Sequence, residues 1–269
     1  MSTGFHVVVL GSLVPDLLQT LEPVQGPTGP ALKNELMLPA VLDPWAGHAL
    51  FEAAHLASRH PGSKVWLVSL GPKAKLHQLM MSIAQKVPFE LVAVDGSASG
   101  FTDSFEVAEA LAGAIERIPA LDRSRLLLFG GCASASRDAG TTVQMVGERL
   151  AIADQFLSAD ELTVSADGTL TVLERVEGGK YLVSEVSGPP CAIAWATGNL
   201  PEPPNNPQVG MMNMRTIMPA LQKAPAVKLA AQGTTFMGVE LPRQERKTRI
   251  VKDVPLDDMA KEIAEWIKA

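Results

Sequence analysis

Cysteine and tyrosine are scarce in this sequence, and its charge balance is negative rather than positive. Two cysteines, Cys132 and Cys191, cannot build the disulfide framework of a small secreted domain. The net charge is −6, which argues against a nucleic-acid partner because such domains normally carry a basic face. One tyrosine and eight phenylalanines also leave little aromatic surface for stacking bases. We therefore expect neither a disulfide scaffold nor a nucleic-acid-binding protein.

Targeting and membrane signals are also missing from the segments where they would be expected. The first residues, MSTGFHVVVL, have no basic region and no cleavage site of small residues. Their apolar run is shorter than the ~20 residues that a membrane-spanning helix needs. We expect a cytoplasmic protein that does not insert into membranes.

Short apolar runs alternate with helical patterns in the first half of the chain. The runs are rich in β-branched residues, which suits strands buried on both faces, and they cover residues 5–10, 64–70, 89–94 and 125–129. Amphipathic helical patterns cover residues 43–60, 72–86, 104–118 and 141–150. Asp43 and Pro44 make a suitable start for the first of these helices. The alternation predicts an α/β fold with a mostly parallel, Rossmann-like sheet flanked by helices.

An antiparallel hairpin is predicted after this alternation ends. Residues 161–186 contain two turn signals, Asp167-Gly168 and Gly178-Gly179, between apolar segments. A further buried strand is predicted over residues 191–197. The proline-rich residues 198–210 predict an exposed loop.

Two long segments, residues 17–42 and the arm that follows residue 223, have little periodicity of their own. Residues 17–42 are rich in proline and glycine and predict an extended excursion. Residues 211–223 predict a short helix interrupted at Pro219. We divide the chain into a nucleotide-binding domain, residues 1–223, and a C-terminal arm, residues 224–269, that ends in a helix beginning near Pro255. Long arms of this kind usually serve a partner or a function.

The segment after the fourth predicted strand, LFGGCASASRDAGTTVQ, is the best candidate for a ligand site. A glycine-rich turn before a helix presents backbone N–H groups, and Ser134, Ser136, Thr141 and Thr142 add hydroxyl groups, so an anion is favoured here. Neither a P-loop lysine nor a G-x-G-x-x-G motif is present. From spacing alone, an ordinary turn between strand and helix is a simpler interpretation than a phosphate cradle.

No set of side chains has the pattern of an active site. Cys132 lies at a helix start and could be a nucleophile, but no histidine is placed beside it, so a small buried thiol is the simpler interpretation. His48 and His55 could share a helix face, but they lack a third ligand and indicate surface or packing roles. No G-x-S-x-G motif occurs. We therefore predict no catalytic residues and no metal site.

Six segments occur in an order that suggests a family. They are VLGSLVPD (residues 9–16), DPWAGHALFEAA (43–54), VSLGP (68–72), LFGGCASASRDAGTTVQMVGERL (128–150), DGTLTVLERVEGGKYLVSEVSGPPCAIAW (167–195) and IMPALQKAP (217–225). Together they resemble the β (small) subunit of electron transfer flavoproteins. The resemblance implies a heterodimer in which an α subunit holds most of the FAD and the β subunit binds AMP. It also implies electron transfer from flavin-dependent dehydrogenases to a quinone-linked or other acceptor.

The resemblance also implies where the cofactors bind. The backbone N–H groups of Ala139 to Thr142 would meet the phosphate of AMP. Trp45 matches an aromatic residue near the flavin, and Leu200 falls near the leucine that docks into partner dehydrogenases. The implied cofactor-binding residues are Leu10, Asp43, Pro44, Trp45, Ala46, Leu70, Gly131, Cys132, Ala133, Ser134, Asp138, Ala139, Gly140, Thr141 and Thr142.

The chain departs from the family pattern at several positions. Ser12 replaces a lysine after the first strand, and Gly140-Thr141 replaces an Asn-Gln pair. PPNNPQVGMMNM, residues 203–214, replaces P-R-Y-A-[ST]-L.

Two alternative functions stay open. One is an electron-bifurcating relative with a second FAD in place of AMP, although DAGTTVQMVG does not match its D-G-D-T-A-Q-V-G pattern. The other is a universal-stress-type adenine-nucleotide sensor, which leaves the hairpin and the arm unexplained.

Overall fold

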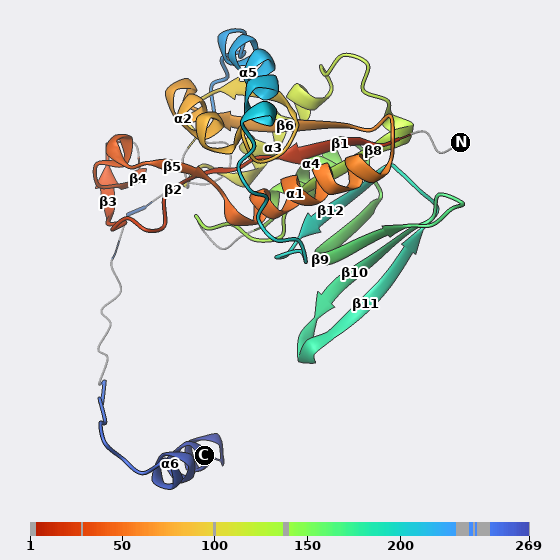
Figure 1. Cartoon of the computed structure of the whole chain (residues 1–269). Helices are drawn as coiled ribbons and strands as arrows, with labels where there is room; N and C mark the ends of the chain where they lie inside the picture. Colours follow the sequence, from red (N-terminus) through yellow and green to blue (C-terminus); the bar gives the residue numbers. More distant parts are fainter. Residues whose placement is uncertain are drawn as a thin grey trace. The chain divides into compact units, whose positions relative to one another are not determined.

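A computed structural model describes residues 4–27, 29–98, 101–136, 140–229, 237–238, 240 and 248–268. The chain divides into two compact units, Met1–Gly238 and Val239–Ala269, and each is described by itself. The first unit contains an eight-stranded sheet with helices on both faces (Figure 1). This is the α/β, Rossmann-like arrangement that the alternating pattern predicts.

The sheet is built outward from its first strand. Its strands are β1 (His6–Leu10), β6 (Lys64–Gly71), β7 (Glu90–Asp95), β8 (Leu126–Gly131), β9 (Asp154–Val164), β10 (Leu170–Val176), β11 (Lys180–Val186) and β12 (Cys191–Trp195). Their order is β11-β10-β9-β12-β8-β1-β6-β7, and all neighbours from β7 to β9 are parallel. The chain builds toward β7 on one side of β1 and toward β12 on the other. Ligands bind at such switch points in doubly wound sheets, at the carboxyl ends of the strands.

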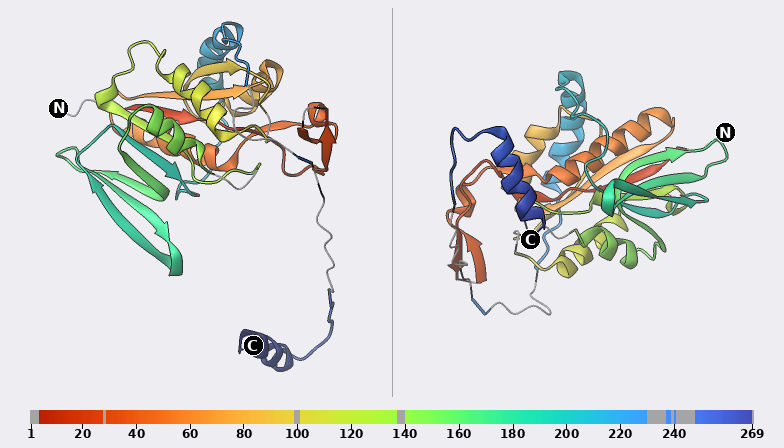
Figure 2. Two further views of the ribbon diagram at one scale, coloured as in Figure 1. Left: turned by 180° about the vertical axis from the view of Figure 1, so that it is seen from behind. Right: turned by 90° about the horizontal axis from the view of Figure 1, so that it is seen from below.

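Helices cover the two faces of the sheet separately. In the first unit they are α1 (Pro44–Arg59), α2 (Lys73–Ile83), α3 (Ser104–Ile115), α4 (Thr142–Arg149) and α5 (Pro207–Gln222), with 3₁₀ turns η1 (Glu35–Met37), η2 (Arg123–Arg125) and η3 (Glu177–Gly179). Val7 and Val9 belong to the core under α1, α2 and α5, whereas Val8 and Leu10 belong to the core under α3 and α4. Both cores form because successive side chains of a strand point to opposite faces. Figure 2 shows these layers from two further sides.

The predicted hairpin is confirmed, and it projects from the sheet as an antiparallel extension (Figure 1). In the turn between β9 and β10, the N–H of Thr169 donates to Asp167 Oδ1 at 3.0 Å, and Gly168 has φ +94°. Gly178 and Gly179, with φ of +73° and +68°, form the turn between β10 and β11. Positive φ explains why glycine occupies these turns.

The prediction for the segment around α5 is wrong at two points. The loop after β12 ends at Asn206, because the side chain of Asn206 accepts from the N–H groups of Gln208 and Val209 and so caps the helix. Pro207 then fits the first helical position, where no N–H partner is needed. Pro219 does not interrupt α5, which continues to Gln222. Ile217 and Leu221 are buried in the core, and their packing outweighs the lost N–H of one proline.

The excursion predicted over residues 17–42 takes part in two small antiparallel pairs, one of which it forms with a strand just before it (Figure 1). β2 (Leu13–Pro15) pairs with β5 (Ala40–Leu42), and β3 (Pro23–Gly26) pairs with β4 (Gly29–Leu32). The η1 turn connects the second pair to β5 and exposes Leu36 and Met37. The excursion returns the chain to α1 without adding a strand to the main sheet.

The second unit contains the predicted C-terminal helix, α6 (Leu256–Lys268). Arg249 donates to both carboxylate oxygens of Glu262, at 2.8 and 3.1 Å, and so connects the preceding segment to the helix. One face of α6 carries large apolar side chains that are exposed: Leu256, Met259, Ile263, Trp266 and Ile267. Of the helices that the structure describes in either unit, none has the length and apolar character needed to cross a bilayer.

Candidate functional site

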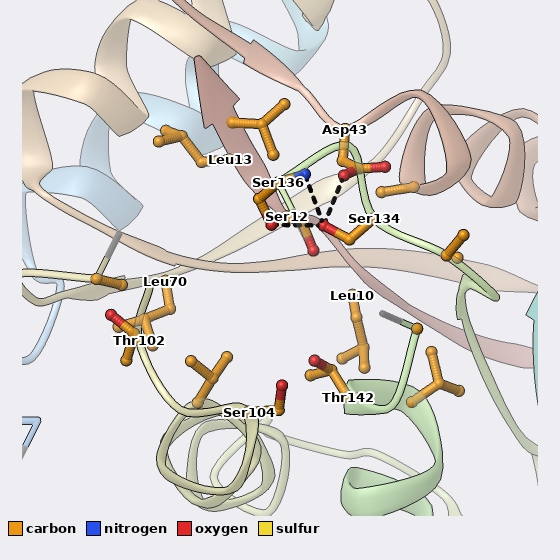
Figure 3. A pocket seen from close by; sticks show the side chains of 18 residues that line it. Leu10, Ser12, Leu13, Asp43, Leu70, Thr102, Ser104, Ser134, Ser136 and Thr142 are labelled. Atoms are coloured by element: carbon orange, nitrogen blue, oxygen red, sulfur yellow. Dashed lines mark hydrogen bonds between the residues drawn. The ribbon is translucent and has the colours of Figure 1, made fainter. Parts of the chain in front are cut away.

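A hollow opens at the carboxyl ends of the parallel strands, where the loops after β1, β6, β7 and β8 converge (Figure 3). It contains about 790 Å³ of space between atoms, including a part that is open to solvent. The described residues that line it are Leu10, Ser12, Leu13, Val14, Asp43, Ala46, Leu70, Ala98, Thr102, Ser104, Val107, Gly131, Ala133, Ser134, Ser136, Gly140, Thr142 and Val143.

Most of the residues predicted to bind cofactors are brought together here. Those that line the hollow are Leu10, Asp43, Ala46, Leu70, Gly131, Ala133, Ser134, Gly140 and Thr142. Pro44 and Trp45 at the start of α1, and Cys132 and Thr141 between β8 and α4, are close in sequence to these residues but are not among the lining residues. Asp138 and Ala139 lie outside the described residues, and Leu200 lies elsewhere, on the loop after β12.

Asp43 connects two of the loops that form the hollow. Only 2% of its surface is exposed. One carboxylate oxygen accepts from the N–H of Trp45 at 3.1 Å and caps α1. The other accepts from the N–H of Ala135 at 2.8 Å. It also accepts from the hydroxyl of Ser134 at 3.2 Å, a bond drawn in Figure 3. The carboxylate therefore fixes the loop after β8 against the start of α1.

Burial and hydrogen bonding act on Asp43 in opposite directions. Burial raises the pKa of its carboxyl group above the ordinary value, and the hydrogen bonds from Ala135, Trp45 and Ser134 oppose this rise. The net direction is upward. Burial therefore makes the charged form of Asp43 costly, and the hydrogen bonds from the loop partly offset this cost.

The glycines of the loop act mainly by allowing close packing. A Cβ on Gly131 would lie 2.5 Å from Cβ of Trp45, and one on Gly130 would lie 2.5 Å from a methyl group of Val143. A Cβ on Gly140 would lie only 1.8 Å from the carbonyl oxygen of Cys132. Side chains at these positions would push α1, α4 and the two sides of the loop apart. The Gly-Gly pair is therefore required by the βα turn itself.

Hydrogen-bonding groups at the start of α4 lie beside the hollow. Thr141 is the N-cap residue, and its side chain makes no capping bond with any described residue. The first helical N–H bond of this turn runs from Met145 to the carbonyl of Thr141 at 3.1 Å, so the N–H groups before Met145 point out of the helix. Thr142 and Val143 of this turn line the hollow. Such a helix start favours an anion.

Hydroxyl groups surround the hollow, whereas its described lining contains no lysine or arginine. The hydroxyls belong to Ser12, Thr102, Ser104, Ser134, Ser136 and Thr142. The hydroxyls of Ser134 and Ser136 lie 2.8 Å apart (Figure 3). An anion bound here would rely on hydroxyl and backbone N–H donors of the described residues.

Sequence reasoning missed the part of the lining that follows β7. Thr102, Ser104 and Val107 belong to the loop and helix after that strand, and no motif marks them. Their position after a strand that lies beside β6 is the only signal in the sequence, since loops at the carboxyl ends of parallel strands meet at one edge. Ser12 was noted only as a replacement for lysine, and it lines the hollow.

Cys132 and the α1 histidines His48 and His55 are the side chains of the sequence that could serve catalysis or metal binding. Cys132 is half-buried rather than buried, because it directly follows the end of β8 at the carboxyl ends of the strands. Its N–H donates to the carbonyl of Trp195 at 2.8 Å. Burial lowers the pKa of His48, and the charge of Glu202 opposes this. Among the described residues, no group of three or more His, Cys, Asp or Glu side chains could hold a metal ion.

A known protein family matches most of the sequence. A model of the electron transfer flavoprotein domain matches residues 34–231, which include α1, the loop after β8, the hairpin and α5. The chain therefore belongs to the electron transfer flavoprotein family, whose members carry electrons. Both subunits of these flavoproteins contain this domain, so the match does not distinguish β from α. No curated protein matched the chain in a sequence search.

Proposed function

We propose that this chain is the β (small) subunit of a heterodimeric electron transfer flavoprotein. With an α subunit it would carry electrons from flavin-dependent dehydrogenases to a quinone-linked or other acceptor. The six segments that resemble the β subunit extend from Val9 to Pro225 and support this assignment over the α subunit. The family match favours an electron carrier over a universal-stress-type sensor.

AMP is the ligand that we propose for the hollow at the carboxyl ends of the strands. The proposal is supported by the start of α4 at Thr142, where backbone N–H groups point out of the helix beside hydroxyl groups from several loops. The phosphate would accept hydrogen bonds from the N–H groups at this helix start and from the hydroxyl of Thr142. Leu10, Leu70 and other apolar lining residues would contact the base. AMP would stabilise the subunit and take no part in electron transfer.

FAD would be held mainly by the α subunit, and it would supply the electron-accepting ring when bound. In this chain the resemblance places Trp45 near the flavin. Trp45 lies where α1 meets the end of β8, since a Cβ on Gly131 would approach its Cβ to 2.5 Å. Trp45 would therefore contribute a rigid apolar contact at the edge of the subunit. Its backbone is fixed by the same carboxylate, Asp43, that fixes the adjacent loop.

The C-terminal arm, residues 224–269, would pack on the α subunit. Residues 225–227 first pass beside β7, where the N–H of Asp95 donates to the carbonyl of Pro225 at 2.9 Å and the N–H of Val227 donates to the carbonyl of Asp95 at 2.8 Å. The exposed apolar face of α6 then supports the proposal, because an amphipathic helix of this kind buries its apolar stripe against a partner. A role in the heterodimer would also explain why this part of the sequence has little periodicity of its own.

Co-expression with an α subunit tests the assignment. We expect a yellow heterodimer that contains FAD and elutes as one species in size-exclusion chromatography. Ile263→Glu, on the apolar face of α6, should weaken the complex because it buries a charge. Lys261→Glu, on the polar side of the same helix, is the matched control and should leave the complex intact. A colourless, monomeric chain in the presence of the α subunit would contradict the proposal.

A further inference from the structure

The segment that follows α5, residues 223–229, crosses the edge of the eight-stranded sheet at β7. Ala224 packs against the core under α1, α2 and α5, whereas Val227 and Leu229 pack against the core under α3 and α4. Because β7 is the end strand of the sheet, the segment passes from one face of the sheet to the other around that strand. We call residues 223–229 the edge clasp.

Two backbone hydrogen bonds attach the edge clasp to the carboxyl end of β7. The N–H of Asp95 donates to the carbonyl of Pro225 at 2.9 Å, and the N–H of Val227 donates to the carbonyl of Asp95 at 2.8 Å. Ala226 pairs with Asp95 as a parallel bridge. The edge clasp thus satisfies backbone groups of the kind that an end strand otherwise leaves unpaired.

Asp95 and Lys73 connect the same region to two helices. Asp95 Oδ1 accepts from the N–H of Lys73, the first residue of α2, at 3.0 Å. A carboxylate is favourable at this position because a helix start is electropositive. Lys73 Nζ donates to the carbonyl of Gln222, the last residue of α5, at 3.3 Å. The end of β7 therefore joins α2, α5 and the edge clasp.

Val227 of the edge clasp lies close to the wall of the hollow at the carboxyl ends of the strands. A Cβ on Gly96, the residue after β7, would lie 3.0 Å from a methyl group of Val227 and 3.0 Å from a methyl group of Leu70. Gly96 therefore lies between these two side chains, and its own N–H donates to the carbonyl of Gly71 at 3.2 Å. Leu70 lines the hollow (Figure 3). Val227 is not among the described lining residues.

One apolar core supports this wall and also receives the edge clasp. The lining residues that belong to the core under α3 and α4, or pack against it, are Leu10, Leu70, Ala98, Val107 and Val143. Val227 and Leu229 pack against the same core. Protein interiors are close-packed, so a change of volume at one side chain displaces its neighbours. A smaller side chain at Val227 should therefore alter the position of the wall.

We propose that Val227 is a positioning residue for the nucleotide hollow. By packing beside Gly96, it holds the end of β7 and the side chain of Leu70 in the position where the base of the nucleotide would make contact. The beginning of the C-terminal arm thus supports the nucleotide site without lining it. The proposal rests on the proposed function for the identity of the ligand, whereas the described contacts alone support the effect of Val227 on Leu70.

Methyl and amide NMR of the full chain without nucleotide tests the position of the wall. Val227→Ala should shift the Leu70 methyl resonances and lower the exchange protection of the Asp95 amide, because the edge clasp holds the acceptor of that amide. Gly96→Ala approaches the same contact from the other side and should also shift the Leu70 resonances. Leu70 resonances that keep their parental positions in either variant would overturn the proposal.

Titration with AMP separates positioning from a general effect on stability. The Kd of Val227→Ala should rise about fivefold or more, as is typical of energetically coupled sites. Val92→Ala is the matched control, because Val92 is a half-buried valine of β7 that packs against the same core and does not line the hollow. It should keep the parental Kd, and so should Val227→Ile, which retains both branches at Cβ. An equal rise in Val92→Ala, or no rise in Val227→Ala, would refute the positioning role.

These outcomes distinguish the positioning role from the proposed function. A parental chain that does not bind AMP would contradict the proposed ligand, and the Leu70 resonances measured without nucleotide would still decide whether Val227 positions the wall. AMP binding that is unchanged in Val227→Ala would agree with the proposed function and contradict the positioning role.

Discussion

Removing the carboxylate of Asp43 should destabilise the domain far more than removing an ordinary helix cap. In Asp43→Ala, the N–H of Trp45 loses its cap, and the Ala135 N–H and the Ser134 hydroxyl lose their acceptor. A cap contributes about 1 kcal/mol, and each hydrogen bond to a charged group about 1.5–3 kcal/mol. Part of this sum is offset, because burial of the charge has a cost that shows as the raised pKa of Asp43. We expect a net loss of about 3 kcal/mol.

Asn206→Ala is the matched control for this prediction. Asn206 caps α5 through its side chain, as Asp43 caps α1, but its side-chain hydrogen bonds to the described residues stay within the first turn of its own helix. It should cost only about 1 kcal/mol. In a domain of this size 1 kcal/mol corresponds to about 2–4 °C in Tm, so the two variants should lower Tm by about 6–12 °C and about 2–4 °C. Thermal and urea unfolding at pH 7 measure both values. Equal losses would refute the role of Asp43 as a connection between two loops.

Three other substitutions give distinct outcomes. Gly140→Ala should cost about 1–3 kcal/mol and weaken nucleotide retention, because its Cβ would lie 1.8 Å from the carbonyl oxygen of Cys132; unaltered Tm and nucleotide content would contradict this. Glu52→Gln should be more stable than the parent above pH 7 by about 1–2 kcal/mol and equal to it near pH 4, as unfolding at several pH values can measure. Pro219→Ala should raise the free energy of unfolding in urea by about 1–2 kcal/mol, because alanine restores a backbone N–H on the exposed side of α5. A lower free energy of unfolding would contradict this prediction.

The sign of the Glu52 prediction follows from its raised pKa. The folded chain holds a proton on Glu52 up to about pH 7, whereas the unfolded chain releases it near the ordinary value of 4.5. The stability that this group contributes is fully present below that ordinary value and is lost as the pH rises through about 7. Glutamine has no proton to release, so this loss is absent in the variant. The energy is reduced from the full value because Glu52 is only partly buried.

The parts of the fold that local patterns determine could be predicted from the sequence. Continuous apolar runs predicted β1, β6, β7 and β8, and Asp167-Gly168 predicted the hairpin turn. Asp43 was predicted as a cap, but its bonds to Ala135 and Ser134 could not be predicted, since they join segments far apart in the chain. Tertiary packing also decided the course of α5, where buried residues keep the helix continuous through Pro219.

The candidate site could be predicted only where a local sequence pattern marks its residues. The loop after β8 was found because glycines and hydroxyl residues before a helix form a recognisable pattern. Thr102 and Ser104 carry no such pattern, and only the order of strands places them beside Thr142. The Gly130-Gly131 pair was interpreted as either a turn or a phosphate cradle. Its contacts with Val143 and Trp45 show that close packing requires both glycines, next to the helix start where an anion would bind.

The nucleotide content of the purified heterodimer is the most direct test of the central claim. The complex should be denatured, and the released nucleotides should be separated and quantified by chromatography. We predict equal amounts of AMP and FAD, with AMP lost and FAD retained in the Gly140→Ala variant because only the hollow in this chain is altered. Two equivalents of FAD without AMP, or FAD alone in the unaltered complex, would contradict the assignment of AMP to this hollow.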